Sequence, residues 1–500
     1  MGSDQALGKK GLVRGLSLFD ATMIVVGSMI GSGIFIVSAE TARLVGAPGW
    51  LLLAWVLAGA MTISGAICFS ELAASMPKAG GPFVFLSEAF GRPVGFLYGW
   101  SQFLIVQSGT IAAVAVAFAN FSGILFPRIS GSNYLIEPVI FGSYAVSLST
   151  QQALAIGSIV LLTVLNTRGI HLGKWIQNTF TLTKTAALLG LVILGLVFGS
   201  NSDGALFSSD MWNSAANGWS LEAAQPAAAA LGPIAAIIVF GKAMTGPLFS
   251  QSAWDNITFT GAEVRDPGRN LPRALIIGCL IVVGLYLLTN LAYVATLSLP
   301  ELQNAPNGRV ASAVMEQVMG TPGVVLISIA LMISTFGCNN GLILSGARVS
   351  YAMARAGYLF APLARTNRHH APAYALAGQC IWASLLVLPR TVTLADGQEP
   401  RFGNVYTQLL EYIVSVDLVS AALSVAAVIV LRRRRPELDR PYKALGYPFT
   451  PAVFLVLSGF VTFTLVVLAP GTAGIGYLIA LTGIPVYMIW RQKGEGRPAV

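Results

Sequence analysis

Long apolar runs constrain this chain more than any other feature of its sequence. Segments of about 20 apolar residues, each long enough to cross a bilayer, recur from end to end, and only 10% of the 500 residues are charged. We therefore predict an all-α membrane protein, because a soluble protein rarely has this composition. Its twelve predicted transmembrane helices lie at 18–44, 50–75, 94–125, 150–167, 174–198, 232–262, 274–298, 321–354, 373–389, 405–431, 449–469 and 472–490.

The positions of the basic residues test this count of helices. Of the 30 lysines and arginines, 22 lie in the two termini and the even-numbered loops, whereas the odd-numbered loops hold only Arg128, Arg309, Arg390 and Arg401. Basic loops stay on the cytoplasmic side. We therefore predict a multi-pass protein of the cell (inner or plasma) membrane, with its N-terminus (1–17) and C-terminus (491–500) in the cytoplasm. The net charge of +9 then reflects topology and not nucleic-acid binding.

The first predicted helix contains Gly31, Ser32 and Gly33 near its middle. Glycine weakens a helix by about 1 kcal/mol relative to alanine, so this stretch favours a local opening. An open backbone at bilayer depth survives only where it lines a buried cavity. Its N–H groups, at the start of the second half-helix, form a site for an anion such as a carboxylate. The alternative is a face of small residues for close helix packing.

The sixth predicted helix is interrupted in a similar way. Gly241, Gly246 and Pro247 break its apolar run, and a polar cluster over 249–255 follows at membrane depth. A kinked packing helix is the alternative interpretation. Interrupted helices at matching positions indicate an inverted repeat of five plus five helices with the substrate between the two breaks.

This repeat divides the chain into segments. We expect the two repeats at 18–198 and 232–431, an extracytoplasmic loop at 199–231, a basic cytoplasmic loop at 432–448, and two additional helices within 449–490. The outer segments 126–149 and 199–231 are rich in Ser, Asn, Gly and Ala. Neither is predicted to form a soluble domain.

Several motifs in order along the chain resemble those of the amino acid–polyamine–organocation (APC) superfamily, and within it the L-type amino acid transporter (LAT) family. The resemblance covers nearly the whole chain, from about 15 to 491. Its motifs are Val26–Phe35, Gly65–Leu72, Met76–Phe83, Glu263–Arg273 and Ser334–Gly341.

The resemblance implies a LeuT-like fold and amino acid transport by alternating access. It implies that the backbone of Gly31, Ser32 and Gly33 binds the substrate carboxylate. Carbonyl groups at the two breaks would bind the amino group, by position those of Met29, Ile30, Phe249, Ser250 and Ser252. Phe249 matches the aromatic lid of the family, and Trp254 matches the tryptophan that follows the break.

Two departures from the family refine this expectation. Ser252 and Ala253 stand where relatives often have two glycines, and their side chains would narrow the pocket toward small or medium neutral amino acids. The segment 126–149 has no cysteine that could bond a glycoprotein heavy chain, so we expect a transporter that works without that partner.

A few polar residues lie inside predicted spans. Lys184 is too deep to reach water easily, and an ammonium there costs at least about 3 kcal/mol. By resemblance it occupies the place of the sodium ion in sodium-coupled relatives, which implies sodium-independent transport; a fixed structural cation is the alternative. Asp417 either relays protons or bonds a neighbouring helix, Asn339 either lines the pocket or bonds a helix, and Asp255 is a further accessory candidate.

Residues near helix ends allow two interpretations as well. Glu71, Glu88, Glu263 and Arg348 form either an inner ion-pair gate or helix caps, and Lys242 either reaches outward to water or belongs to an outer gate.

Three other functions are possible for such a chain. A cationic amino acid or polyamine transporter of the same superfamily would need acidic residues at the pocket, and Asp255 is the one candidate. An intramembrane enzyme would need paired catalytic groups within the spans, and a channel would not need two interrupted helices. We expect no cofactor, because no phosphate-binding Gly-x-x-x-x-Gly-Lys motif occurs, and no metal, because His171, His369 and His370 lie in separate contexts. The sequence leaves open whether transport is exchange or proton symport.

Overall fold

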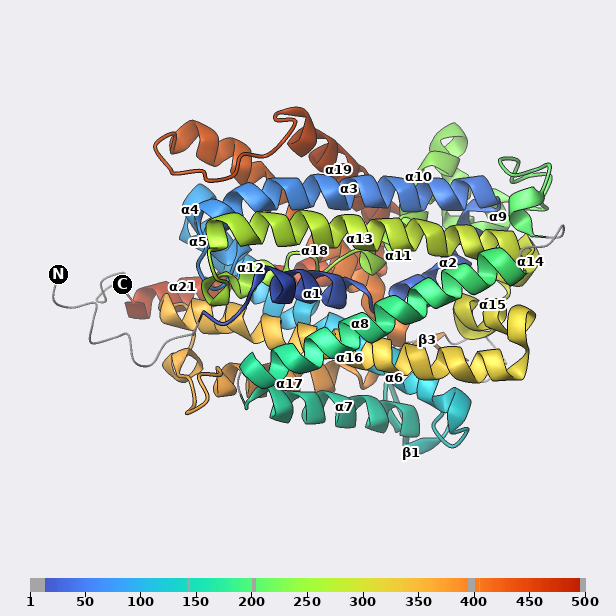
Figure 1. The fold of residues 1–500 in the computed structure, drawn as a ribbon, viewed down its shortest axis with the longest axis horizontal. Coiled ribbons are helices and arrows are strands. Elements are labelled where there is room, and N and C mark those ends of the chain that lie inside the picture. The colour runs from blue at the N-terminus through green and yellow to red at the C-terminus, as the bar shows by residue number, and fades with distance from the viewer. Residues whose placement is uncertain are drawn as a thin grey trace.

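Helices lie side by side along one common direction in a computed structural model of the chain (Figure 1). The structure describes residues 14–142, 144–168, 170–199, 204–393, 401–403 and 405–494. The beginning of α1 (Leu18–Met29) and the end of α21 (Gly483–Gly494) lie at the same end of the bundle (Figure 1). An even number of crossings produces this arrangement.

The structure confirms the predicted helical membrane fold. Within the described residues, ten segments are long and apolar enough to span a membrane, and two shorter helices supply the predicted fourth and ninth spans. In chain order the crossing elements are α1 followed by α2 (Gly33–Val45), α3 (Pro48–Ser75), α5 (Arg92–Ser101) with α6 (Gln107–Leu125), α7 (Thr150–Asn166), α8 (Ile170–Leu194), α10 (Ala235–Ala243) with α11 (Thr245–Ser250), α13 (Pro267–Thr296), α16 (Thr321–Arg355), α17 (Ala373–Leu386), α18 (Val405–Arg434), α19 (Phe449–Leu468), and α20 (Pro470–Leu481) with α21.

Shorter helices connect these crossings. The α-helical ones are α4 (Pro82–Phe90), α9 (Leu221–Ala224), α12 (Asn256–Phe259), α14 (Leu299–Gln303) and α15 (Val310–Met319). Two π-helical turns are η1 (Gln102–Val106) and η2 (Gly195–Gly199), and the 3₁₀ turns are η3 (Ala205–Phe207), η4 (Pro226–Ile234), η5 (Gly261–Glu263), η6 (Pro306–Gly308) and η7 (Ala361–Ala364).

Local sequence signals set several helix ends. Ser17 accepts a hydrogen bond from the backbone of Asp20 and the Asp20 carboxylate bonds back to Ser17, a reciprocal cap that begins α1. Ser149 and Gln152 cap the start of α7 in the same way. Gly46 ends α2 with a φ of 66°, a left-handed conformation that glycine adopts without strain.

The core of the bundle pairs helices that are five crossings apart. The second crossing, α3, packs along the seventh, α13, and the third, α6, packs along the eighth, α16. The first and sixth also meet, because α2 contacts both α10 and α11. Contacts between equivalent helices are what an inverted repeat of two five-helix units requires, and they bring the two helix breaks together.

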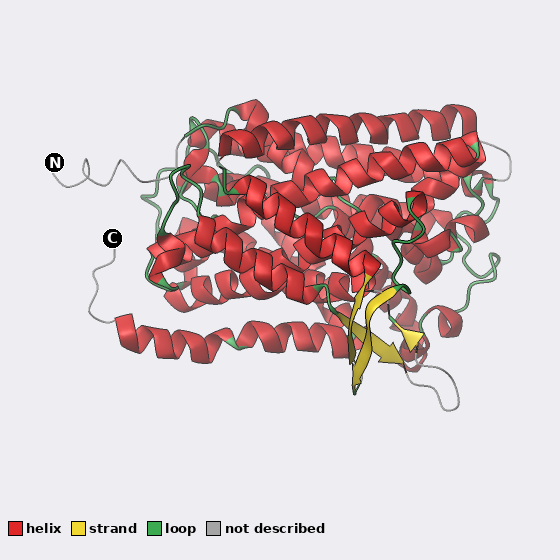
Figure 2. Cartoon of the chain, turned by 90° about the horizontal axis from the view of Figure 1, so that it is seen from below, coloured by secondary structure: helices red, strands yellow, loops and turns green. Residues whose placement is uncertain are grey.

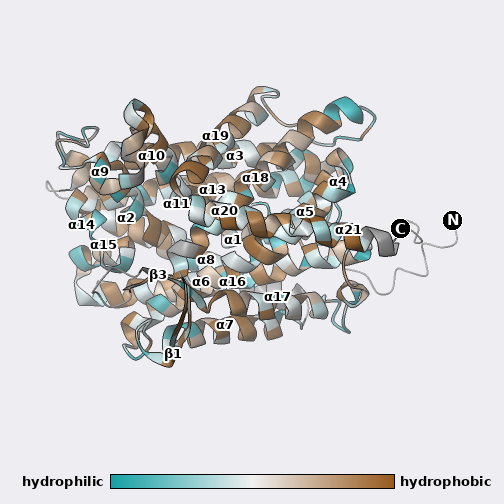
Figure 3. Ribbon diagram, turned by 180° about the vertical axis from the view of Figure 1, so that it is seen from behind, coloured by the Kyte–Doolittle hydropathy of each residue, from teal (hydrophilic) through white to brown (hydrophobic). Residues whose placement is uncertain are grey.

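The outer surface of the bundle is apolar, as contact with lipid requires. Leu161, Leu182, Ile193 and Phe463 are each more than half exposed. Hydrophobic colour runs along the helices, whereas hydrophilic colour is more frequent at the two ends of the bundle (Figure 3). Hydrogen bonds between side chains join helices in the interior; the Ser38 hydroxyl, for example, donates to Asn290 Oδ1 at 2.7 Å.

A small antiparallel sheet is an addition that the sequence did not predict. Its strands follow the order β1 (Tyr134–Phe141), β2 (Tyr144–Ser149), β3 (Pro389–Thr393) and β4 (Arg401–Phe402). The sheet is visible beside the helices in Figure 2. It joins the segment before α7 to the segment after α17. The ninth crossing therefore ends at Leu386 and not at the predicted 389, because Pro389 begins a strand that pairs with Val146.

Candidate functional site

The first helix break lies where the sequence predicted it. α1 ends at Met29 and α2 begins at Gly33, with the intervening backbone out of helical register. The first N–H groups of α2 have no acceptor within their own helix. The partial positive charge of this helix N-terminus therefore lies in the buried interior of the protein.

Side chains from neighbouring helices hold the carbonyl groups of this break. Lys184 of α8, only 1% exposed, donates from Nζ to the Ile30 oxygen at 2.7 Å and also to the Gly27 oxygen. The Tyr286 hydroxyl of α13 donates to the Met29 oxygen at 2.8 Å. The Cys338 thiol of α16 donates to the Ser28 oxygen at 3.2 Å. These donors replace the hydrogen bonds that a continuous helix would supply.

The second break lies between α11 and α12. α11 ends at Ser250, and α12 begins only at Asn256. Within the break Ala253 has a φ of 64°, a left-handed conformation that costs about 1 kcal/mol or more for a residue with a side chain. Glycine at this position would avoid that strain.

The two breaks face each other. A Cβ atom added to Gly33 would collide with the side chain and Cα atom of Ser250. The Ser32 hydroxyl shares a hydrogen bond of 2.9 Å with the Tyr406 hydroxyl of α18. The Tyr406 ring meets the Phe249 ring edge-on, with centroids 6.1 Å apart. Phe249 and Tyr406 therefore close over the start of α2.

Comparisons with known proteins agree with this geometry. The model of a family described as amino acid permease matches residues 16–490. The chain belongs to the amino acid permease family.

Individual relatives match over almost the whole chain. The Asc-type amino acid transporter 1 of Mus musculus and the large neutral amino acids transporter small subunit 2 of Homo sapiens are each 30% identical to it, over 96% of this chain and 82% of the relative. The serine/threonine exchanger SteT of Bacillus subtilis is 28% identical over 97% of this chain and 98% of its own length.

Four other predicted site residues of the permease lie together in a second group. Ser252, Trp254, Asp255 and Asp417 line a small cavity of about 40 Å³ between the second break and α18. The Trp254 ring lies edge-on to Phe69 of α3, with centroids 4.7 Å apart. Met29, Ile30, Gly31, Ser32 and Gly33 do not line this cavity, and neither do Phe249, Ser250 or Lys184. The predicted residues thus divide between the facing breaks and the cavity beside them.

The asparagines of α16 take different positions. Asn340 Oδ1 accepts a hydrogen bond of 2.9 Å from Asn166 Nδ2, which joins α16 to α7. The Asn339 side chain is buried and its amide has no hydrogen-bond partner among the described residues. Asn340 therefore bonds two helices.

Lys242 lies in the last turn of α10. Its Nζ donates at 3.0 Å to Gln225 Oε1, in the segment that precedes η4. It therefore points away from the two breaks.

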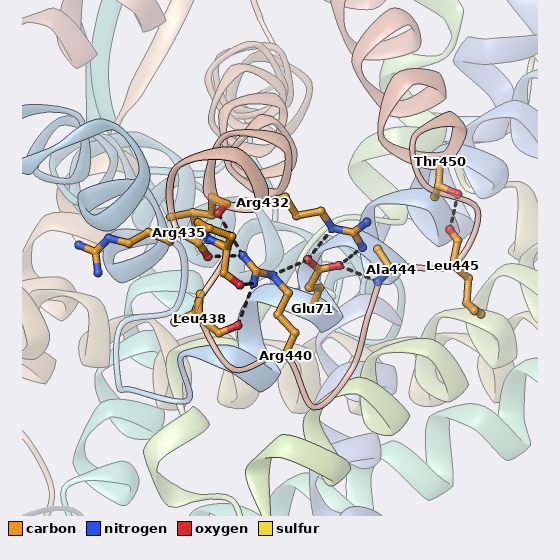
Figure 4. A network of polar contacts seen from close by, with 10 residues as sticks. Glu71, Arg432, Arg435, Leu438, Arg440, Ala444, Leu445 and Thr450 are labelled. Carbon is orange, nitrogen blue, oxygen red and sulfur yellow. Dashed lines mark hydrogen bonds and ion pairs between the residues drawn. The ribbon is translucent and has the colours of Figure 1, made fainter.

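Ion pairs join the helix ends on the side of the termini. Glu263 accepts from Arg348 Nε at 2.6 Å, and both side chains are only 2% exposed. Glu71 receives Arg432 at 2.5 Å, Arg440 at 3.4 Å and the backbone N–H of Ala444 at 2.7 Å (Figure 4).

Glu88 pairs with Arg435 at 3.2 Å. Glu71, Glu88, Glu263 and Arg348 were predicted from the sequence as gate or cap residues, but Arg432, Arg435 and Arg440 were not. The basic run from Arg432 to Arg435, directly after a predicted helix, was the available signal. Tyr286 and Tyr406 were also missed, because nothing in their local sequence distinguishes them from packing tyrosines.

Proposed function

We propose that this permease is a sodium-independent secondary transporter of neutral L-amino acids that works by alternating access. One observation carries the proposal: two helix breaks face each other, and the Lys184 ammonium occupies the carbonyl groups of the first break. A fixed ammonium supplies the positive charge that a bound sodium ion would otherwise provide.

In this proposal the two breaks together bind both charged ends of the substrate. The N–H groups at Gly31, Ser32 and Gly33 receive the carboxylate. The carbonyl groups of Met29, Ile30, Phe249, Ser250 and Ser252 are the candidates for receiving the ammonium group. Phe249 covers the bound substrate. Trp254 supports the second break from the side of the cavity of about 40 Å³ that it lines with Asp255 and Asp417, which we call the inner cavity.

Small or medium substrates fit this account best. Ser252 and Ala253 add side chains at the second break. The names of the relatives include an Asc-type amino acid transporter, a large neutral amino acids transporter and a serine/threonine exchanger. A cationic substrate is less well supported, since Asp255 lies beside the inner cavity and not between the facing breaks.

The mode of coupling is either exchange or proton symport. A serine/threonine exchanger among the relatives favours exchange. Asp255 and Asp417 line the same inner cavity, which favours a proton-linked step. We further propose that the protein works in the cell membrane with both termini in the cytoplasm, without a heavy-chain glycoprotein and without enzymatic activity.

Purified protein in liposomes tests the proposal. Uptake of labelled serine, alanine, leucine, phenylalanine and lysine is measured with sodium or choline outside, with and without a pH gradient, and with and without internal amino acid. We expect uptake of small neutral amino acids that is equal in sodium and in choline. Stimulation only by internal amino acid indicates exchange, and stimulation by an inward proton gradient indicates symport. A strict sodium requirement, or transport of lysine alone, would contradict the proposal.

A further inference from the structure

A second and larger cavity lies on the opposite side of the facing breaks from the inner one. It encloses about 460 Å³, within the range of small-molecule sites, between α2, α6, the segment 127–131, the tip of η6 and the start of α18. Arg309 and Arg390 line it, and none of its described lining residues is acidic. A site built from these residues would attract an anion.

Arginine is rare in the loops on this side of the protein. Only four basic residues lie in the odd-numbered loops, and two of them, Arg309 and Arg390, converge on this one cavity. Basic residues outside the membrane oppose the usual topology signal. Two of them at one cavity therefore point to a ligand.

Arg390 is the more deeply placed of the two. The residue is 7% exposed, and its Nη1 donates to the Tyr134 hydroxyl at 3.3 Å while the guanidinium lies 5.7 Å from the centre of the Tyr134 ring. Its Nε is buried and has no hydrogen-bond partner within the described part of the chain. A buried charged donor without an acceptor is costly, so a carboxylate arriving at Arg390 would relieve that cost.

Arg309 reaches the same cavity from a tight turn. Asn307 and Gly308 have φ values of 53° and 72°, and the turn rests on α2 at Ile36. Burial lowers the pKa of both guanidinium groups from the usual arginine value, but a guanidinium remains protonated at neutral pH. Neither Arg309 nor Arg390 forms an ion pair with any other residue that the structure describes.

The cavity leads directly to the facing breaks. Tyr406 lines it and shares a hydrogen bond with Ser32 at the start of α2, while its ring contacts Phe249. The residues that close over the first break are thus part of the boundary of this cavity.

We propose that this cavity is an outer binding site, in which Arg390 and Arg309 hold the carboxylate of an incoming amino acid before Tyr406 and Phe249 move aside. The site rests on the proposed function, since its ligand is the transported amino acid. The planar guanidinium fork binds a carboxylate through two parallel hydrogen bonds. Because the site faces only one side, it lowers KM for uptake and leaves KM for the inner face unchanged.

Transport in oriented membrane vesicles tests the site. Uptake rates are measured in right-side-out and inside-out vesicles, and the rates of vector-only vesicles are subtracted. KM is then determined for the wild type, Arg390→Gln, Arg309→Gln and the double variant. Arg128→Gln is the matched control, because Arg128 is an exposed arginine of the same outer side that does not line the cavity. Propionate, a carboxylate without an amino group, serves as the competing probe.

We expect Arg390→Gln to raise KM about tenfold in right-side-out vesicles, as the loss of one charge-assisted hydrogen bond implies, with Vmax and the inside-out KM unchanged. Wild-type KM rises with salt between about 0.01 M and about 0.3 M ionic strength, and the double variant loses this dependence. Propionate inhibits the wild type and the control more strongly than the double variant. Arg390→Lys keeps the charge and retains the salt dependence.

Two outcomes would overturn the site in different ways. If the double variant has the same KM, salt dependence and propionate inhibition as the wild type, the outer site is wrong while the transport function stands. Absence of wild-type uptake for every amino acid would instead remove the proposed function on which the site depends. A variant that also loses transport in inside-out vesicles shows a general defect, and would contradict an effect confined to the outer face.

Discussion

Lys184 is the residue that most tightly constrains the first helix break. Its ammonium is almost fully buried and binds the carbonyl groups of Gly27 and Ile30. Both are carbonyls of α1 near the point where its helical hydrogen bonding ends. A charge at this depth is tolerated only because those contacts replace water. The same contacts therefore fix the path of the backbone.

Replacing Lys184 by methionine removes the charge and both hydrogen bonds while keeping a similar length. Each hydrogen bond to a charged group contributes about 1.5–3 kcal/mol, so we expect uptake to fall more than tenfold at equal protein levels. Lys242→Met is the matched control, with an expected loss of less than about twofold, because Lys242 bonds Gln225, in the segment before η4, and not a carbonyl group of either break. Equal uptake by Lys184→Met and the wild type would contradict this role.

Gly33 is the second residue on which the site depends. Gly33→Val places a branched side chain where Ser250 already lies, so we expect insertion into the membrane without measurable uptake. Gly157→Val is the control, because no atom lies within 4 Å of a Cβ atom added there, and it retains uptake. Transport by Gly33→Val would show that the two breaks do not approach as closely as described.

At the scale of elements, ion pairs connect the helix ends on the side of the termini. Glu71 links α3 to the end of α18 and to the segment before α19 through three separate donors (Figure 4). Glu263 links η5 to α16 through Arg348. These contacts hold the helix ends together at this side of the bundle.

The variants Glu71→Gln and Glu88→Gln compare the loss of a buried ion pair with the loss of an exposed ion pair. Breaking a buried pair costs about 3–5 kcal/mol, so Glu71→Gln should lower the apparent Tm in detergent by several degrees. The Glu88–Arg435 pair has side chains that are 41% and 52% exposed, and its loss should cost about 1 kcal/mol or less. Equal Tm values for the two variants would mean that the Glu71 cluster contributes no more than a surface pair.

Individual elements show how much of the fold could be predicted from the sequence. Apolar length predicted the crossing helices. Gly31, Ser32 and Gly33 predicted the first break and the polar cluster over 249–255 predicted the second, because these signals are local. The sheet was not predicted, since residues 126–149 were interpreted by composition as a polar loop. The run Tyr134–Phe141 contains β-branched and aromatic residues that favour strands. The pairing of Tyr144–Ser149 with Pro389–Thr393, far away in sequence, could not be deduced from local patterns.

The site was predictable to a similar degree. Gly31, Ser32, Gly33 and Lys184 follow from what is costly or weak inside a membrane helix. Tyr406 became visible only through its hydrogen bond to Ser32, a contact between residues 374 positions apart. The convergence of Arg309 and Arg390 on one cavity likewise depends on tertiary packing.

At the scale of the whole molecule, the fold joins two five-helix units so that equivalent helices meet. The start of α1 and the end of α21 lie at one end of the bundle, whereas α9 and α14 lie at the other (Figure 1). The asymmetry of basic residues predicts that the end with α21 is cytoplasmic. This orientation determines which cavity faces the incoming substrate.

Cysteine labelling tests the orientation. Ser132 is exposed next to the sheet, and Asp439 is exposed in the segment between α18 and α19. In intact cells a membrane-impermeant maleimide should label Ser132→Cys, and should label Asp439→Cys only after the membrane is opened. The wild type controls for its four native cysteines, of which three are buried. The reverse pattern would invert the topology.

A cryo-EM structure of the permease with a bound neutral amino acid tests the central claim most directly. The account predicts density for the substrate between the two breaks, with its carboxylate at the N–H groups of Ser32 and Gly33 and its ammonium at carbonyl groups of 249–252. Density confined to another cavity, or a first membrane helix that runs unbroken from Leu18 to Val45, would contradict it.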